Sequence, residues 1–348
     1  MANIKDVAER AGVAPITVSR CINNSGFCSP ETRKRVEAAI EELGFVPNRL
    51  ASGLRSKRTK TIALVLTDIT DPFFTTIARG VEDIASDAGY TVIFCNTDES
   101  ISKEQMYVQM LLEKRVDGIL LVPAQSTSNS IALIQKHNIS VVVLDRRVPN
   151  IKTDLVYCDS EEAAYQLTRL LLSLGHRAIV MLNRSINVSS CQDRLNGYRR
   201  ALLEAGIPET TGQEYQGAYT QESGYEMTYK AMACSPKPTA LVAANYSFAY
   251  GALKALREMG VRTPEDVAIV SFDDLPTTLY PFPFLTVAVQ PAYEMGQKAM
   301  EILLKKISSP SSNCCEEIIL PMEIVIRQSS GVSRANEKSK GGGVLKIP

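Results

Sequence analysis

Residues 61–96 read TIALVLTDITDPFFTTIARGVEDIASDAGYTVIFCN, and this stretch decides the fold. Two near-continuous apolar runs, 61–67 and 91–96, enclose a segment near 74–88 whose apolar residues recur at helical spacing. Strands without polar alternation are buried on both faces, which is typical of a parallel sheet covered by helices. The stretch therefore predicts a β-α-β unit within an α/β domain.

The same alternation continues along the chain in two blocks. The first block has further expected strands at 118–122 and 141–144 and helices near 103–114 and 128–136. The second has expected strands at 178–182, 239–243 and 267–271, with helices near 161–174, 193–205, 223–233 and 248–259. We therefore expect two doubly wound parallel-sheet lobes in tandem, an architecture that holds ligands at the carboxyl ends of its strands.

The first sixty residues differ from the rest. They hold eleven basic and six acidic residues, a net charge of about +5, although Lys+Arg and Asp+Glu both number 38 over the whole chain. Short helices are expected at 4–11, from 15 onward and from 29 to 44, with a tight turn between the first two. This arrangement is that of a helix-turn-helix.

Composition excludes several classes of protein. The chain has 348 residues and is 45% hydrophobic, enough for two or three globular units and too apolar for a disordered chain. No apolar run is long enough to span a bilayer and no apolar signal core opens the chain, so we expect a cytoplasmic protein without membrane association. The eight cysteines form no C-x-x-C pair, which favours reduced, buried thiols and no metal site.

Short motifs recur in a fixed order along nearly the whole chain. They are IKDVA (4–8), AGV (11–13), TVSR (17–20), IN (22–23), VPN (46–48), LASGLR (50–55), DPFF (71–74), VDGI (116–119), LGHR (174–177), RLNGY (194–198), PTA (238–240), SFDD (271–274) and LT (285–286). Together they closely resemble the lactose-repressor and purine-repressor family of bacterial transcriptional regulators.

The resemblance implies an architecture with five segments. A helix-turn-helix domain (1–46) and a hinge helix (47–60) would precede two lobes similar to periplasmic binding proteins. The N-terminal lobe would comprise 61–158 with 288–321, and the C-terminal lobe 159–287 with 322–331. The Lys- and Gly-rich tail, 332–348, is expected to be disordered.

The resemblance also implies a set of DNA-contacting residues. They are Ile16, Thr17, Ser19, Arg20 and Asn23 on a recognition helix in the major groove, and Arg49, Ala51, Leu54 and Arg55 on the hinge. Arg20 can make a bidentate contact to guanine, and Leu54 can act as a minor-groove wedge. The sequence departs from the family at Ala14, Pro15 and Ile16, where polar residues are common, which leaves the operator sequence open. The competing interpretations are a solvated positive face for the helices and a solvated linker for the hinge.

An effector site is implied by loop residues that follow the expected strands. Its residues would be Asp71, Phe73, Phe74, Arg146, Ser190, Arg194, Tyr219, Asn245, Asp273 and Gln290. Alternatively, both phenylalanines belong to the core, and Asp145 with Arg146 forms an ion pair that ends a strand. Tyr246 follows Asn245 where the family usually has Asp, so the effector class stays open.

These patterns predict a transcriptional repressor, a homodimer that binds a pseudo-palindromic operator and a small metabolite, with a sugar or sugar acid favoured. The ligand would close the lobes and alter the spacing of the hinge helices, an allosteric coupling. A purine, or a protein corepressor, is the alternative within the family. A transporter's solute-binding protein is the distant alternative, but it would need a secretion signal and would have no use for residues 1–60. The chain has two histidines and none of the nucleophile-elbow or phosphate-loop motifs, so no catalytic residue and no cofactor is expected.

Overall fold

The computed structural model describes residues 2–23, 26–45, 58–127, 129–184, 187–208, 213–274, 283–309 and 314–331. The chain divides into two compact units, Met1–Thr59 and Lys60–Pro348, and each is described by itself. The expected hinge residues Arg49, Ala51, Leu54 and Arg55 lie outside the described residues, as does the tail from 332 to 348. None of the described helices combines the length and the apolar character needed to cross a membrane.

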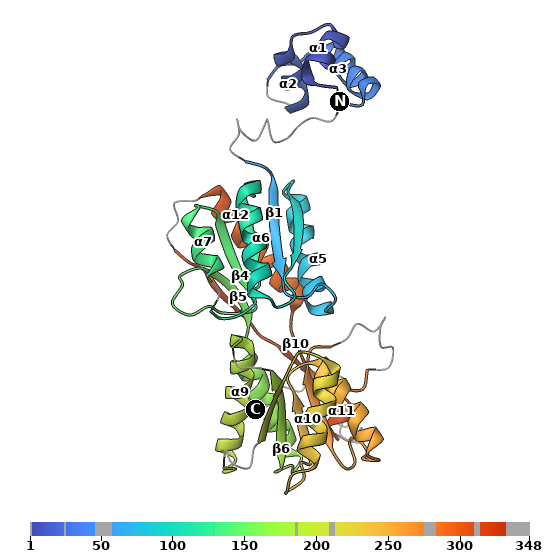
Figure 1. Ribbon diagram of the computed structural model, residues 1–348, viewed down its shortest axis with the longest axis vertical. Coiled ribbons are helices and arrows are strands. Elements are labelled where there is room, and N and C mark those ends of the chain that lie inside the picture. The colour runs from blue at the N-terminus through green and yellow to red at the C-terminus, as the bar shows by residue number, and fades with distance from the viewer. Residues whose placement is uncertain are drawn as a thin grey trace, which may run out of the picture. The chain divides into compact units, whose positions relative to one another are not determined.

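The described part of the N-terminal unit contains three helices, α1 (Ile4–Ala11), α2 (Pro15–Asn23) and α3 (Pro30–Leu43), shown in blue in Figure 1. Side chains fix the helix starts: Asn3 and Asp6 form a capping box on α1, and Ser29 caps α3. Gly12 and Gly44 end α1 and α3 in left-handed conformations. Seven buried residues form the core of the unit: Val7, Ala8, Ala11, Val18, Cys21, Val36 and Ala39. The predicted helix-turn-helix is confirmed.

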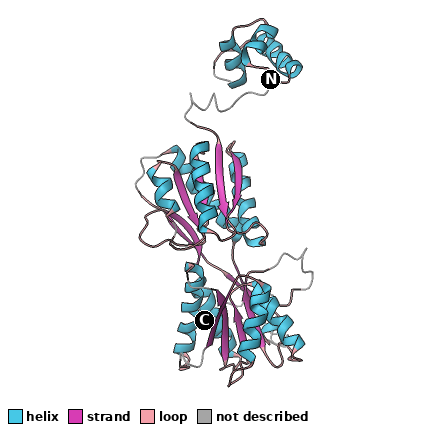
Figure 2. Ribbon diagram, in the orientation of Figure 1, coloured by secondary structure: helices cyan, strands magenta, loops and turns pink. Residues whose placement is uncertain are grey.

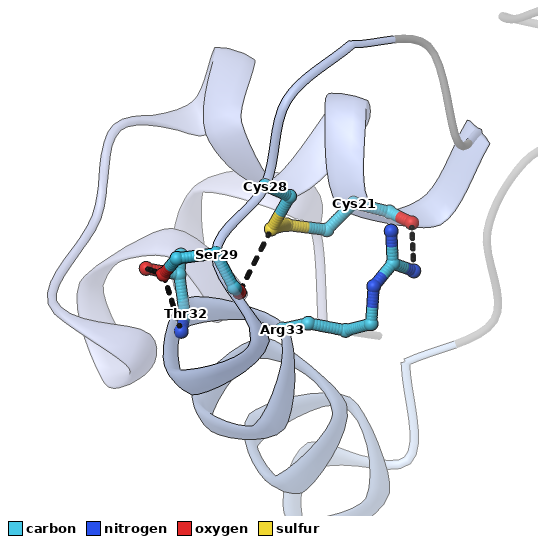
Figure 3. The surroundings of a disulfide bond; sticks show 5 residues. All are labelled: Cys21, Cys28, Ser29, Thr32 and Arg33. Atoms are coloured by element: carbon cyan, nitrogen blue, oxygen red, sulfur yellow. Dashed lines mark hydrogen bonds between the residues drawn. A yellow bond between two sulfur atoms is a disulfide. The ribbon is translucent and has the colours of Figure 1, made fainter.

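A disulfide joins the end of α2 to the segment that precedes α3. It links Cys21 and Cys28, and the Arg33 guanidinium donates a hydrogen bond (3.0 Å) to the carbonyl oxygen of Cys21 beside it (Figure 3). The expectation that all cysteines are reduced is therefore wrong for this pair. Cys21 is also a buried core residue of this unit. Its spacing from Cys28 in the sequence does not by itself predict a disulfide between them.

The second unit contains two parallel-sheet lobes with helices on both faces of each sheet (Figures 1 and 2). The first sheet has the order β11-β5-β4-β3-β1-β2. Its strands are β1 (Thr61–Leu66), β2 (Thr91–Asn96), β3 (Gly118–Leu121), β4 (Ser140–Leu144), β5 (Asp154–Cys158) and β11 (Glu317–Leu320). Its helices are α5 (Pro72–Asp87), α6 (Ile101–Lys114), α7 (Ser130–Lys136) and α12 (Ala292–Ser308).

The second sheet repeats this plan with the order β12-β10-β9-β8-β6-β7. Its strands are β6 (Ile179–Arg184), β7 (Gln213–Gly217), β8 (Ala240–Ala243), β9 (Ala268–Phe272), β10 (Thr286–Val289) and β12 (Glu323–Val325). Its helices are α8 (Ser160–Ser173), α9 (Ser189–Glu204), α10 (Gln221–Met232) and α11 (Tyr246–Glu258), with a short 3-10 turn, Gln328–Ser330. All pairings in both sheets are parallel except that of β10 with the edge strand β12.

Burial explains why the strands lack polar alternation. Along β1, Ile62, Leu64 and Leu66 pack in the cluster formed with α5 and α12, whereas Ala63 and Val65 pack in the opposite cluster with α6 and α7. Every residue in the middle of such a strand packs against helices on one face of the sheet or the other, so polar and apolar residues do not alternate along it. This is the burial pattern predicted from the 61–67 run.

The chain passes between the two sheets after β5, after β10 and after β11. All seven strands expected from the sequence are present within two residues of their expected ends, whereas β5, β7, β10, β11, β12 and α12 were not predicted. Strand β10 belongs to the second sheet as far as Val289, two residues beyond the expected crossover after 287. Helix α9 begins at Ser189, four residues before the expected start.

Helices α5 and α12 approach each other closely through two glycines. A Cβ at Gly80 would overlap the carbonyl oxygen of Tyr293, and a Cβ at Gly296 would overlap that of Ile77. Helix α12 returns to the first lobe from the second sheet, so this contact secures the C-terminal crossover.

Candidate functional site

A cavity of about 380 Å³ lies between the two lobes of the second unit. Its walls are the loops that follow β1, β2, β4, β6 and β9, together with the ends of nearby helices. The carboxyl ends of parallel strands are where open α/β sheets bind ligands, and the volume is in the usual range of about 300–1,000 Å³ for small-molecule sites.

Nine of the ten residues that the sequence assigned to an effector site line this cavity. They are Asp71, Phe73, Phe74, Arg146, Ser190, Arg194, Tyr219, Asp273 and Gln290. Asn245 does not line it. Its side chain caps α11 by accepting a hydrogen bond from the Phe248 backbone N–H (2.7 Å), and it lies next to Tyr219.

The segment Asp71–Phe74 begins α5 and forms part of the first-lobe wall. The Asp71 carboxylate accepts a hydrogen bond from the Phe73 backbone N–H (2.9 Å), which caps the helix. The Phe73 and Phe74 rings meet edge to face with centroids 5.1 Å apart. Phe74 lines the cavity and is also part of the first-lobe core, so it fits both the effector-site and the core interpretation. Phe73 lines the cavity and is half-buried.

Asp71 has an unusual protonation equilibrium. Its burial and the nearby charge of Asp273 on the second lobe raise its pKa from 3.8 to about 7. Burial, together with the charge of Asp145, also raises the pKa of Asp273, while Arg194 and Gln290 act against this increase. Carboxylates from both lobes thus repel one another across one cavity.

Arg146 is held by acceptors from its own lobe. Its Nη1 and Nη2 atoms each lie 2.7 Å from an oxygen of Glu99, and Nη1 also donates to the carbonyl oxygens of Pro123 and Ala124. Asp145 lies 3.4 Å from its Nε atom. The sequence leaves Arg146 as either an effector contact or the partner of Asp145 in an ion pair. In the structure it lines the cavity, and its Nη atoms pair with Glu99, whereas Asp145 lies beside its Nε atom.

Glu99 is a cavity residue that the sequence analysis missed. Besides Arg146 it contacts Arg184 of the second lobe, at 3.0 Å. Burial disfavours its ionised form, but the hydrogen bonds and charges of Arg146 and Arg184 outweigh that effect and lower its pKa to about 2. Glu99 lies just beyond the end of β2, and Arg184 ends β6, so the strand-end rule could have identified both.

Arg194, like Arg146, is a buried guanidinium with an unused Nε donor. It is 4% exposed, donates to the carbonyl oxygen of Ala244 and lies over the Phe272 ring, while its Nε atom has no partner among the described residues. Gln290 donates to Asp273 (2.6 Å), and its Oε1 atom likewise has no partner there. Buried polar atoms without partners are costly and are typical of positions where a ligand binds.

Direct bonds connect the lobes beside the cavity. Arg147 of the first lobe pairs with Asp193 of α9, and its backbone N–H donates to the Ser189 hydroxyl (2.8 Å). The Ser126 backbone N–H donates to the carbonyl oxygen of Asn187 (3.0 Å). Closure of the lobes is therefore stabilised by specific polar contacts.

Helix α2 presents a polar and basic surface. Ile16 and Arg20 are exposed and Thr17 and Ser19 are half-buried, while Val18 is fully buried. The aliphatic part of the Arg20 side chain lies against Gly26, within 4 Å of the position that a Cβ atom would take there. Asn23 ends α2, but its side chain lies outside the described residues.

Two other motifs have structural roles. His176 of the 174–177 motif has its Nδ1 atom 3.0 Å from the Thr239 hydroxyl of the 238–240 motif, so the two motifs contact each other within the second lobe. No cluster of three or more His, Cys, Asp or Glu side chains suited to a metal ion occurs in the part of the chain that the structure describes.

The chain matches known proteins in both units. Residues 3–48 match the family described as bacterial regulatory proteins, lacI family, and residues 59–328 match periplasmic binding proteins and sugar binding domain of LacI family. The HTH-type transcriptional repressor PurR of Photobacterium profundum is 34% identical over 332 residues, covering 94% of this chain and 98% of that protein.

Two solved structures are similar over nearly the full length. The lac repressor dimer bound to operator and the anti-inducer ONPF has a TM-score of 0.83 and 27% identity, covering 94% of this chain and 99% of the other. The complex of the transcriptional regulator CelR with cellobiose has a TM-score of 0.71 and 31% identity, covering 94% and 100%.

Proposed function

Since this chain belongs to the lacI family of bacterial regulatory proteins, and is therefore a DNA-binding transcriptional repressor with an effector-binding domain, we propose that a sugar bound between its lobes controls its affinity for the operator. The observation that carries this proposal is the cavity of about 380 Å³ into which both lobes project charged side chains. Sugars present hydroxyl groups around the whole ring, and carboxylates and guanidiniums are suitable partners for them.

The sequence favours a sugar acid equally with a sugar, but we propose a sugar alone. The Nη donors of Arg146 are already used by Glu99 and by backbone carbonyls, which leaves its Nε atom, without a hydrogen-bond partner among the described residues, as the one donor for a ligand carboxylate. A purine remains the second candidate, because PurR repressors are among the relatives at 34% identity. A flat base carries its polar atoms only at its rim, which fits the acceptors on both sides of the cavity less well than a sugar does.

Thermal-shift measurements of the full chain can separate these effectors. A panel of neutral pentoses and hexoses is expected to raise the melting temperature, whereas hypoxanthine and guanine are expected to leave it unchanged. Each stabilising compound is then added to the protein bound to operator, and fluorescence anisotropy reports release or tightening. Stabilisation by the bases alone would replace the sugar with a purine, and stabilisation by none would favour a protein corepressor.

On the DNA side, we propose that α2 enters the major groove, with Ile16, Thr17, Ser19 and Arg20 facing the bases. These side chains are exposed or half-buried, whereas Val18 is fully buried, and this difference supports the orientation. Arg20→Ala is expected to cost about 1–3 kcal/mol at one base pair and to relax preference there. Arg262→Ala, which changes an exposed arginine on the second lobe, is the control and is expected to leave operator binding unchanged.

We also propose a homodimer on a pseudo-palindromic operator, within the cytoplasm where that DNA lies. The edge strand β2 leaves Ile93 and Phe94 exposed at 37% and 48%, and Met106 of α6 is exposed at 57%. An open sheet edge with apolar side chains favours pairing with a second copy. Regulation by binding needs no catalytic step, and we assign none to the chain.

A further inference from the structure

We propose that the effector is a sugar carrying a protonated primary amine, held between Asp71 of the first lobe and Asp273 of the second. This inference rests on the proposed sugar effector and names its chemical class more closely.

The charges that line the cavity are unbalanced. Three guanidiniums, those of Arg146, Arg184 and Arg194, face six carboxylates, those of Asp68, Asp71, Asp98, Glu99, Asp145 and Asp273. Asp98 is neutralised by Lys103, which lies outside the lining. When Asp71 is ionised, as it is above its pKa of about 7, the cavity keeps an excess of negative charge, and a bound cation would favour that ionised form. This excess favours a neutral or cationic ligand over an anion.

The partners of each group show where that excess lies. Glu99 is satisfied by Arg146 and Arg184, and Asp145 lies beside Arg146. Asp68 accepts hydrogen bonds from the backbone N–H and hydroxyl of Thr70. Asp71 has the Phe73 N–H as its hydrogen-bond donor, and Asp273 has the amide of Gln290 and the nearby charge of Arg194. Asp71 and Asp273 are both more than nine-tenths buried and come from opposite lobes, so a cation between them would offset their repulsion and favour closure of the lobes.

The unpartnered atoms at this place have the polarity that an ammonium group requires. An ammonium donates three hydrogen bonds and accepts none. Asp71 and Asp273 supply two acceptors, and the Oε1 atom of Gln290, buried and without a partner in the described structure, supplies the third. The Nε atom of Arg194, the unpartnered donor on the second-lobe wall, then suits a ring or hydroxyl oxygen of the same ligand.

A metal cation would also neutralise this negative charge, but the described residues contain no cluster of side chains suited to binding one. The half-buried Phe73 ring on the first-lobe wall offers an apolar surface, which fits a sugar ring bearing an amine better than a bare cation.

Matched sugar pairs test the inference. Isothermal titration of the full chain compares D-glucosamine with D-glucose, D-galactosamine with D-galactose and D-mannosamine with D-mannose. N-acetyl-D-glucosamine, in which the amine is an uncharged amide, serves as a further control. We expect at least one amine to bind about tenfold or more tightly than its neutral parent, the gain from one charge-assisted contact.

Asp71→Asn then locates the effect. Asparagine also caps helices well, so α5 keeps its start while the charge is removed. The variant is expected to lose the tenfold preference, so that each amine and its neutral parent bind within about threefold of one another. Asp87→Asn, at the far exposed end of α5, makes the same chemical change outside the cavity and is expected to keep the preference.

The outcomes separate the two proposals. Neutral parents that bind as tightly as the amines, or an amine preference that survives Asp71→Asn, would overturn the amine inference and leave a sugar-controlled repressor standing. Binding of neither the amines nor their parents would overturn both.

Discussion

Asp145 of the first lobe and Asp273 of the second occupy equivalent positions in the two sheets. Each directly follows the third strand in the order of its sheet, β4 or β9. Each backbone N–H donates to a carbonyl oxygen of the adjacent second strand, Val156 of β5 (2.9 Å) or Ala288 of β10 (3.0 Å). Both residues have left-handed backbones, with φ of 63° and 65°. Such conformations cost about 1–3 kcal/mol for a residue other than glycine and are concentrated at functional sites. The repeated architecture thus directs a carboxylate from each lobe into one cavity.

Arg194→Ala is expected to abolish the response to the sugar effector while leaving operator affinity unchanged. The arginine lines the cavity and has an unpartnered donor, and its removal leaves a ligand oxygen desolvated, at a cost of about 2–5 kcal/mol of binding free energy. Titration of the stabilising sugar into operator-bound variant measures the effect. Arg169→Ala, an exposed arginine on α8 of the same lobe, is the matched control. A response at the wild-type sugar concentration would make Arg194 purely structural.

Glu99→Gln is expected to lower the free energy of unfolding by about 2–4 kcal/mol, because it removes the closer anion of the buried Arg146 guanidinium and leaves only the more distant Asp145 carboxylate. Arg184→Gln is expected to cost less than half as much, since Glu99 then keeps both bonds to Arg146. Urea unfolding of the full chain measures the difference. Equal losses in the two variants would show that the contact between lobes, rather than the pair within the first lobe, carries the energy.

The pH dependence of the Glu99 effect has a defined sign. The pKa of Glu99 is lowered from 4.5 to about 2 in the folded protein. Its stabilisation is therefore fully present above about pH 4.5 and is lost as the pH falls toward 2. The stability difference between wild type and Glu99→Gln should shrink over that window.

Asp71 gives the opposite dependence. Its pKa is raised from 3.8 to about 7, so the folded protein holds a proton that the unfolded chain releases, and stability falls as the pH rises through this window. One such group contributes at most about 1.4 kcal/mol per pH unit. Asp71→Asn is expected to be more stable than wild type at pH 7.5, and the gap should close toward pH 4, as urea unfolding will show. A gap that is constant with pH, or an equal one in Asp87→Asn, would contradict this assignment.

Much of the fold could be predicted because its signals are local. The apolar run at 61–67 and the caps at Asn3 and Ser29 depend on neighbours within a few residues. Strand β7, QEYQG, is a polar edge strand, and β11 is paired on one side and partly exposed, so neither has the apolar run that marks an inner strand. Their positions are set by tertiary pairing, which sequence periodicity does not encode.

The residues of the candidate site also divide into those that sequence motifs identify and those whose roles depend on tertiary contacts. Phe73, Arg194 and Asp273 lie in motifs whose order could be recognised, and the structure brings them to one cavity. Glu99 and Arg184 lie in no motif, and their importance comes from a contact between residues 85 positions apart in different lobes. The role of Arg146 likewise depends on a tertiary contact, since only the position of Glu99 reveals that its Nη donors are already used.

The last prediction concerns the disulfide between Cys21 and Cys28. Closing a loop with a sequence separation of seven stabilises the folded state by about 2–3 kcal/mol in the chain-entropy model. Reduction with dithiothreitol is therefore expected to lower the melting temperature of the N-terminal unit, and Cys28→Ser should melt at the lower temperature with or without reductant. Cys314→Ser, which removes an exposed free thiol, is the control and should respond like wild type.

Thiol titration checks the same bond independently. The unreduced, denatured protein should show six free thiols, because two of its eight cysteines are joined. Eight free thiols together with a melting temperature insensitive to dithiothreitol would mean that the pair is reduced in the isolated protein. The helix-turn-helix would then depend on its seven-residue core and on the hydrogen bond from the Arg33 guanidinium of α3 to the Cys21 carbonyl oxygen of α2.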